Sequence, residues 1–198
     1  MGKRQEAALI TKKNIVDAMR ILLKEKSADT ISIEDITTKA GVAKGSFYTH
    51  FKRKEDVISV IALEQYDLIK ENVLKSKDGV YKQLISYLKG SAAIIEDNTL
   101  QIAQNWMKSV TAPLPEEVNG VEKYKYDSDN IKLILEKAVE VQELAFDTPV
   151  GYVGEWIMNV YYGAVASWCI TKGEVDLVDN IGHFCDVALL PVLEKFMN

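Results

Sequence analysis

The chain has 198 residues, 47% of them hydrophobic, so it can bury a core without disulfides or metals. Its two cysteines, Cys169 and Cys185, have neither the number nor the spacing of a disulfide framework or a zinc site. No stretch approaches the roughly 18 consecutive apolar residues of a membrane span, and the start lacks the apolar segment of a signal peptide. We therefore expect a cytoplasmic protein with reduced thiols, no membrane partner, no metal and no cofactor.

The formal net charge of −5 is the sum of two parts of opposite sign. Residues 1–54 carry 12 Lys and Arg against 6 Asp and Glu, a net of +6, which leaves 12 against 23, a net of −11, for residues 55–198. A basic first quarter followed by an acidic remainder is typical of a DNA footprint attached to a separate assembly module. Uneven surface charge without function is the alternative.

Apolar spacing predicts helices and no strand. The expected helices cover residues 5–25, 32–40, 44–51, 54–73, 80–97, 99–111, 128–146, 150–172 and 176–197. Residues 113–127, with two prolines, are expected to form a longer loop. The fold class is therefore all-α with about nine helices: an N-terminal three-helix domain (1–54), a connecting helix (55–75) and a C-terminal helical domain (76–198).

Residues 32–54 have the pattern of a helix-turn-helix. Ser32 is a candidate N-cap of the first helix, and Gly41 can take the positive φ that a tight turn needs. Apolar residues fall where the two helices would touch: Ile33, Ile36, Ala40, Val42, Phe47 and Phe51. The second helix keeps a polar outer face that suits a DNA groove.

That outer face carries donors for bases and phosphates. Lys44 can reach guanine acceptors or phosphate, Ser46 and Thr49 can bond to bases or backbone, and Tyr48 and His50 suit phosphate oxygens. Lys54 adds a charge to the positive end of the next helix, where with Lys52 and Arg53 it would form an anion clamp. The candidate DNA-binding residues are Lys44, Gly45, Ser46, Tyr48, Thr49, His50 and Lys54.

This segment resembles the tetracycline-repressor (TetR) family, whose signature has an Ile-x-x-Ala first helix, a Gly-Val turn and a Tyr-x-His-Phe-x-x-Lys-Glu close. The chain has Ile-Val-Asp-Ala at 15–18, Ala-Gly-Val-Ala-Lys-Gly-Ser-Phe at 40–47 and Tyr-Thr-His-Phe-Lys-Arg-Lys-Glu at 48–55. It departs from the pattern at Ala43, which removes the usual N-cap hydroxyl, and at Thr37, which we expect to be half-buried and bonded back to its own helix. The resemblance covers about residues 10–60.

The resemblance implies C-terminal helices that form a two-fold dimer and enclose a small-molecule pocket, with ligand binding moving the DNA-reading heads out of register. Two-fold pairing also places two heads on successive turns of DNA, so a palindromic or pseudo-palindromic double-stranded operator is expected. The candidate dimer residues are Trp168, Phe184, Leu189, Val192 and Phe196. The candidate residues for a largely apolar or aromatic effector are Trp106, Tyr126, Phe146, Trp156 and Tyr161, although aromatic residues at helical spacing are more often core.

Charged and metal-ligating residues of the C-terminal part point to no chemistry of their own. The acids Asp127, Asp129, Glu136, Glu140 and Glu143 are expected to solvate a helix face, with one available to neutralise a cationic ligand. His183 and Cys185 lack the second pair of ligands that a metal site needs.

The sequence is compatible with three functions. The principal one is a homodimeric repressor released from its operator by a small effector. The second is a ligand-independent DNA-bound scaffold or nucleoid-associated protein that binds a protein partner. The third, an all-α enzyme, is remote, because the chain has two histidines and no HExxH, GxSxG, P-loop or dinucleotide glycine pattern, so no catalytic residue is assigned.

Overall fold

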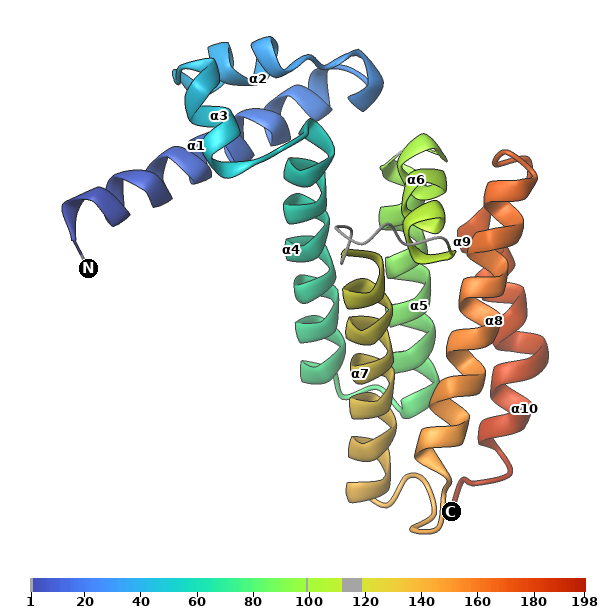
Figure 1. The fold of residues 1–198 in the computed structure, drawn as a ribbon. Coiled ribbons are helices and arrows are strands. Elements are labelled where there is room, and N and C mark those ends of the chain that lie inside the picture. The colour runs from blue at the N-terminus through green and yellow to red at the C-terminus, as the bar shows by residue number, and fades with distance from the viewer. Residues whose placement is uncertain (1, 99, 112–118) are drawn as a thin grey trace. The chain divides into compact units, whose positions relative to one another are not determined.

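The computed structural model describes residues 2–98, 100–111 and 119–198 (Figure 1). Within these ranges the regular structure is helical, and the one isolated β-bridge joins Leu144 to Met197, which confirms the all-α class. The chain divides into two compact units, residues 1–65 and 66–198, and the helix α4 (Lys54–Lys75) belongs to both.

The N-terminal unit is a small helical domain with its own core. It contains α1 (Lys3–Glu25), a 3-10 turn (Ala28–Thr30), α2 (Ile33–Ala40), α3 (Lys44–His50) and the start of α4. Helix α1 packs against both α2 and α3, and α2 packs against α3. Fully buried side chains from all four helices form the core: Ile15, Met19, Ile36, Phe47 and Val57.

Local sequence explains the turn between α2 and α3. Ser32 and Asp35 form a capping box, in which the Asp35 amide donates to Ser32 Oγ at 3.1 Å and the Ser32 amide donates to Asp35 Oδ2 at 2.9 Å. Gly41 ends α2 with a φ of 66°, as expected of the turn residue. Ala43 precedes α3 without a side-chain cap, and Thr37 is buried with its hydroxyl donating to the Glu34 carbonyl at 3.2 Å.

The C-terminal unit is a helical bundle. It contains the rest of α4, α5 (Val80–Asp97), α6 (Leu100–Thr111), α7 (Asn119–Glu140), α8 (Val150–Ile170), α9 (Leu177–Phe184) and α10 (Leu190–Leu193). The most extensive packing is of α5 on α9 and of α7 on α8, and these helices run side by side in Figure 1. The apolar residues whose spacing predicts these helices form one continuous core.

Helix α7 begins earlier and ends earlier than the sequence predicts. It starts at Asn119, so residues 119–127 are helical and not part of a loop, while 113–118 lie outside the described residues. It ends at Glu140, where Gln142 takes a φ of 62° and the Leu144 amide turns back to the Ala138 carbonyl at 3.1 Å. The apolar residues after Glu140 therefore pack as a turn, which the 3.6-residue period does not distinguish from helix.

The last predicted helix, 176–197, is interrupted. A π-helical turn, Cys185–Leu189, separates α9 from α10. Pro191 lies two residues further on and has no N–H to donate to the preceding turn, so a break in the regular ladder is expected just before it.

Candidate functional site

Helix α3 divides into a buried and an exposed face, as the sequence predicts. Phe47 and Phe51 are buried, whereas Lys44, Gly45, Tyr48 and Thr49 are exposed and Ser46 and His50 are half-buried. Tyr48 is 52% exposed, and its ring meets the ring of Phe47 edge-on with centroids 5.6 Å apart. The aromatic core thus holds the polar face in place.

The exposed face of α3 is open at Gly45. No atom lies within 4 Å of the position that a Cβ would take on Gly45. The Thr49 hydroxyl donates to the Gly45 carbonyl at 3.1 Å, so Thr49 is back-bonded to its own helix. The polar face of α3 has no side chain at Gly45 and is supported by the buried Phe47. It can therefore approach a DNA groove closely.

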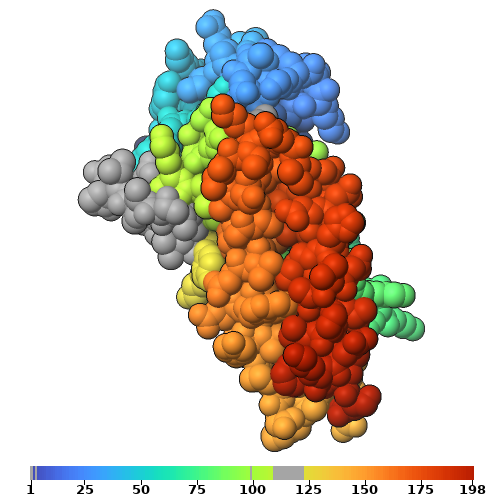
Figure 2. Space-filling model, turned by 90° about the vertical axis from the view of Figure 1, so that its right-hand side faces the viewer, coloured from blue at the N-terminus to red at the C-terminus, as the bar shows by residue number. Residues whose placement is uncertain are grey.

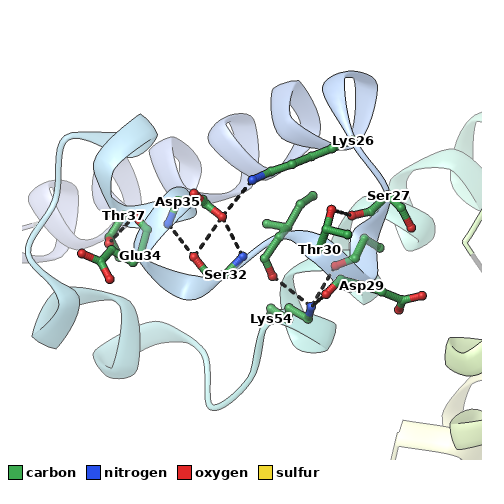
Figure 3. A network of polar contacts seen from close by, with 11 residues as sticks. Lys26, Ser27, Asp29, Thr30, Ser32, Glu34, Asp35, Thr37 and Lys54 are labelled. Carbon is green, nitrogen blue, oxygen red and sulfur yellow. Dashed lines mark hydrogen bonds and ion pairs between the residues drawn. The ribbon is translucent and has the colours of Figure 1, made fainter.

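The structure gives Lys54 a different role from the one predicted. Its ammonium donates to three carbonyl oxygens of the segment between α1 and α2: Ala28 at 2.8 Å, Asp29 at 3.1 Å and Ile31 at 2.9 Å (Figure 3). An ammonium has three N–H donors, and all three are used. Lys54 therefore fastens α4 to this segment and has no donor left for a phosphate.

The start of α4 is also occupied by the chain's own carboxylate. Asp56 Oδ2 accepts hydrogen bonds from the amides of Lys52 and Arg53, each at 2.9 Å. The anion clamp expected over residues 52–54 is therefore reduced to the exposed side chains of Lys52 and Arg53. Sequence alone did not reveal this, because the partners of Lys54 lie more than 20 residues earlier.

A second cluster of functional groups lies in the C-terminal unit around Asp127, which is 1% exposed. Its carboxylate accepts hydrogen bonds from the Tyr87 hydroxyl at 2.8 Å, from the Tyr162 hydroxyl and from the Lys123 ammonium. Asn130 donates to the Tyr87 oxygen at 3.1 Å. Burial, and then the charge of Asp127, raise the pKa of both tyrosines far above the usual value, so they act as neutral donors.

Aromatic rings surround this carboxylate. The Lys123 ammonium lies 3.7 Å from the centre of the Tyr66 ring. The ring of Tyr162 stacks on Trp106 at 5.3 Å and contacts Tyr124 at 5.2 Å, and Tyr161 meets Tyr162 edge-on at 5.3 Å. Two buried hydroxyls, those of Tyr161 and Ser91, have no hydrogen-bond partner among the described residues.

The structure brings only part of the predicted effector set together. Trp106 and Tyr161 join the Asp127 cluster, and Tyr126 lies at its margin, where its hydroxyl donates to Asp67 at 2.7 Å. Phe146 is 95% exposed in the turn after α7, and Trp156 packs on Phe184 instead, with centroids 5.5 Å apart. Both lie outside the cluster.

Sequence reasoning missed the polar centre of the cluster. Asp127 was expected to solvate a helix face, but it is buried, and the residues not predicted for the site are Tyr66, Tyr87, Lys123, Asn130 and Tyr162. One signal was present: Lys123, Asp127 and Asn130 have the i, i+4, i+7 spacing of one helix face. That spacing indicates a shared face only if residues 119–127 are helical.

The predicted dimer residues are mostly inside the protomer. Trp168 and Leu189 belong to the buried core of the C-terminal unit, and Phe184, Val192 and Phe196 are half-buried against it. The exposed apolar residues of the same region are different ones: Tyr152, Ile170, Val175 and Val187. Figure 2 shows α8 and residues 177–193 side by side on one face of this unit.

Other kinds of site are not indicated in the described part of the chain. No three His, Cys, Asp or Glu residues there are placed to hold a metal ion, and none of its helices is long and apolar enough to cross a membrane. An open groove of about 330 Å³ lies between α6 and the end of α8, lined by Gln101, Gln104, Asn105, Met107, Lys108, Cys169 and Ile170. The residues that line it do not include those of the Asp127 cluster.

The chain is similar in sequence to known proteins. Residues 15–61 match the sequence model of the bacterial regulatory proteins of the tetR family. The chain is 27% identical to the Transposon Tn10 TetC protein of Escherichia coli, over 91% of this chain and 90% of that protein.

Solved structures share the fold over nearly the whole chain. A transcriptional regulator from Cytophaga hutchinsonii has a TM-score of 0.70 at 16% identity, covering 93% of this chain and 97% of that one. The regulator FadR from Bacillus subtilis, solved in complex with stearoyl-CoA, has a TM-score of 0.57 at 19% identity, covering 88% and 96%.

Proposed function

We propose that the chain, which is similar to the TetR family of transcriptional regulators, is a homodimeric repressor, released from a palindromic or pseudo-palindromic operator by a small molecule. The observation that carries the proposal is the exposed polar face of α3 on its buried aromatic support, Phe47 and Phe51. The net charge of +6 over residues 1–54 supplies the attraction to phosphates.

In this proposal the residues of α3 divide the work of binding DNA. Lys44, exposed at the first position of α3, reads a base edge or a phosphate, and Gly45 allows close approach of the backbone. Ser46, Tyr48, Thr49 and His50 contact bases or the sugar-phosphate backbone. Lys52 and Arg53 take the phosphate contact first assigned to Lys54, whose ammonium is already occupied.

A second copy of the chain is needed because one three-helix head reads only a few base pairs. Exposed apolar residues support pairing through this unit, since Ile170 at the end of α8 is 79% exposed and Val187 between α9 and α10 is 77% exposed. Gly163, on the exposed side of α8, has no atom within 4 Å of its Cβ position, so another helix can come close. A protein interface would cover these exposed apolar side chains.

The effector acts in the C-terminal unit. An effector changes DNA affinity only if it binds the two states of the protein with different affinity. The Asp127 cluster supports a ligand there, because the buried Tyr161 hydroxyl has no partner among the described residues, which is unfavourable in a finished core. The solved FadR complex with stearoyl-CoA shows a ligand-bound protein of the same fold.

The alternative is a ligand-independent DNA-bound scaffold or nucleoid-associated protein. It requires a C-terminal unit whose polar groups are all satisfied and DNA binding that ignores sequence. The unpaired Tyr161 and Ser91 hydroxyls favour the effector-controlled regulator over this alternative. An enzyme is not proposed, since the family is one of transcriptional regulators.

DNA-binding titration tests the proposal. The full-length protein is titrated, by fluorescence anisotropy, against labelled duplexes from the region upstream of its own gene and against a shuffled duplex of equal length. We expect tighter binding to one native duplex, with affinity that falls steeply between 50 and 200 mM salt. Absent or salt-independent binding would contradict DNA binding, and equal affinity for the shuffled duplex would favour the nucleoid-associated alternative.

A further inference from the structure

We propose that the Asp127 cluster is a cation site, and that the effector is a small organic cation bearing an aromatic group, which displaces the Lys123 ammonium. The inference rests on the proposed function, because it names the chemical class of the effector. Four features carry it: a buried carboxylate, a lysine ammonium held over an aromatic ring, the Tyr161 hydroxyl without a partner and a neighbouring aromatic stack.

The buried carboxylate requires a positive charge beside it. Asp127 is 1% exposed, and its carboxylate accepts hydrogen bonds from two tyrosine hydroxyls and from the Lys123 ammonium. A buried charge without a counter-charge is strongly unfavourable. Any ligand that displaces Lys123 must therefore bring a positive charge of its own.

Lys123 already shows how a cation is held there. Its ammonium lies between the Asp127 carboxylate and the face of Tyr66, 3.7 Å from the ring centre. Carboxylate on one side and an aromatic face on the other is the environment that binds organic ammonium groups. The site recognises the charge and not the lysine, so a ligand ammonium fits the same position.

Lys123 is suited to leave. It stands on the same helix as Asp127, four residues earlier, and its side chain is 14% exposed on a flexible four-carbon stem. Burial lowers the pKa of Lys123, because desolvation of the ammonium outweighs the attraction of Asp127. Release of the ammonium into water recovers that hydration, which offsets part of the cost of exchange.

The remaining groups define the rest of the ligand. The Tyr161 hydroxyl has no hydrogen-bond partner among the described residues, and its ring meets edge-on the ring of Tyr162, whose hydroxyl donates to Asp127. A ligand donor or acceptor would satisfy it. Tyr162 stacks on Trp106 and contacts Tyr124 at a tilt, so aromatic rings that favour an aromatic ligand group flank the carboxylate.

Neutral and anionic ligands fit less well. A neutral molecule in the place of Lys123 would leave Asp127 buried without a counter-charge, and an anion would add a like charge to it.

The experiment therefore compares 2-phenylethylammonium with propylbenzene, which has the same shape without the charge, and with 3-phenylpropionate. Each is titrated into the full-length protein by isothermal titration calorimetry, without DNA.

We expect the wild-type protein to bind the ammonium compound at least tenfold more tightly than propylbenzene and not to bind the carboxylate. Lys123→Met removes the competing ammonium and should tighten binding of 2-phenylethylammonium about tenfold or more. Asp127→Asn keeps the size and an acceptor but removes the charge, and should abolish the preference. Tyr66→Leu should weaken cation binding, whereas Tyr66→Phe keeps the aromatic face and should retain it.

Lys70→Met is the matched control. Lys70 also pairs with a carboxylate, Asp67 at 2.6 Å, and lies 5.1 Å from the ring centre of Tyr126, but its partner is exposed. Its loss should not change cation binding. The inference is overturned if propylbenzene binds as tightly as the cation or if Lys123→Met does not tighten cation binding. Failure here with intact operator binding would leave the proposed function standing.

Discussion

The ammonium of Lys54, at the first position of α4, donates a hydrogen bond to the carbonyl oxygen of Ile31 at 2.9 Å (Figure 3). Ile31 is 1% exposed, so its carbonyl group has little access to water. Two more carbonyls, of Ala28 and Asp29, share the same ammonium. A residue that the motif suggests for DNA therefore supports the fold of the head.

Substitution of Lys54 by Met should destabilise the N-terminal unit. It removes three charge-assisted hydrogen bonds and leaves carbonyls without a partner, at a cost of about 1–3 kcal/mol. Hydrogen exchange of the α2 and α3 amides in the full-length protein measures this opening. Lys52→Met, on the exposed neighbour, is the control and should leave exchange unchanged. Equal exchange in the two variants would contradict the supporting role.

Substitutions of three exposed residues should change DNA binding in different ways. Lys52→Ala should lower affinity for all duplexes and reduce the slope of log affinity against log salt by about one phosphate contact. Tyr48→Phe should also weaken binding on every sequence. Lys44→Ala should change base preference if Lys44 reads a base, and a uniform loss would assign it to phosphate. An unchanged salt slope in Lys52→Ala would remove Lys52 from the interface.

Two glycines of the helix-turn-helix should respond in opposite ways to alanine. Gly41 has a φ of 66°, so Gly41→Ala should destabilise the head by about 1–2 kcal/mol through backbone strain alone, with open space at the Cβ position. Gly45 lies inside α3, so Gly45→Ala should stabilise it by about 0.5–1 kcal/mol. Hydrogen exchange reports both changes.

Gly45→Ala also tests close approach to DNA. If the backbone at Gly45 meets the operator, the variant should bind DNA more weakly although its fold is more stable. Stability and affinity that rise together would show that Gly45 does not lie against DNA.

Local rules account for most of the N-terminal unit. The Ser32 and Asp35 cap, the turn at Gly41 and the buried faces of Phe47 and Phe51 all depend on residues within four positions of one another, so the sequence pattern reveals them. The role of Lys54 could not be predicted in this way. Its carbonyl partners carry no side-chain signal, since any residue type supplies the same oxygen.

The C-terminal unit shows where pattern reading stops. Helical spacing identified its helices, but it did not show which face of the last segment is inside, because the π-turn before Pro191 shifts the register. Leu189 is therefore buried and Val187 is exposed. The Asp127 cluster joins residues from α4, α5, α7 and α8, and only tertiary packing brings them together.

Acid should weaken the capping box of α2. Hydrogen bonds from the Ser32 amide, then from Lys26 and the Ser32 hydroxyl, lower the pKa of Asp35 from 3.8 to about 2. Because the folded-state pKa is depressed, this stabilisation is complete above about pH 5 and is lost as the pH falls through about 4 towards 2. A carboxyl ¹³C NMR titration of Asp35 should show the lowered pKa directly.

Asp35→Asn gives the matching stability test. The difference in opening free energy of the α2 amides between wild type and Asp35→Asn should be constant above about pH 5 and shrink below about pH 4. Glu34→Gln, in the same first turn of α2, is the control and should show no such convergence. A difference that does not change with pH would assign the loss to packing and not to the charge of Asp35.

A negative charge introduced by substitution at Val187 or Ile170 should dissociate the proposed dimer. Val187 and Ile170 are exposed and apolar, so Val187→Glu or Ile170→Glu should leave the protomer fold intact. In a two-fold interface each substitution occurs twice, which places two like charges in or beside the buried surface. Sedimentation velocity should then show a monomer, and operator affinity should fall because a single head contacts half of the site.

The control for this test is Leu133→Glu, which changes an exposed leucine on α7. It should keep both the dimer and its operator affinity. If Val187→Glu and Ile170→Glu also sediment as dimers, the face of α8 and residues 177–193 is not the interface, and the exposed apolar residues there need another partner. Since Trp168→Ala and Leu189→Ala remove buried core, they should lower stability by about 2–5 kcal/mol before they change association.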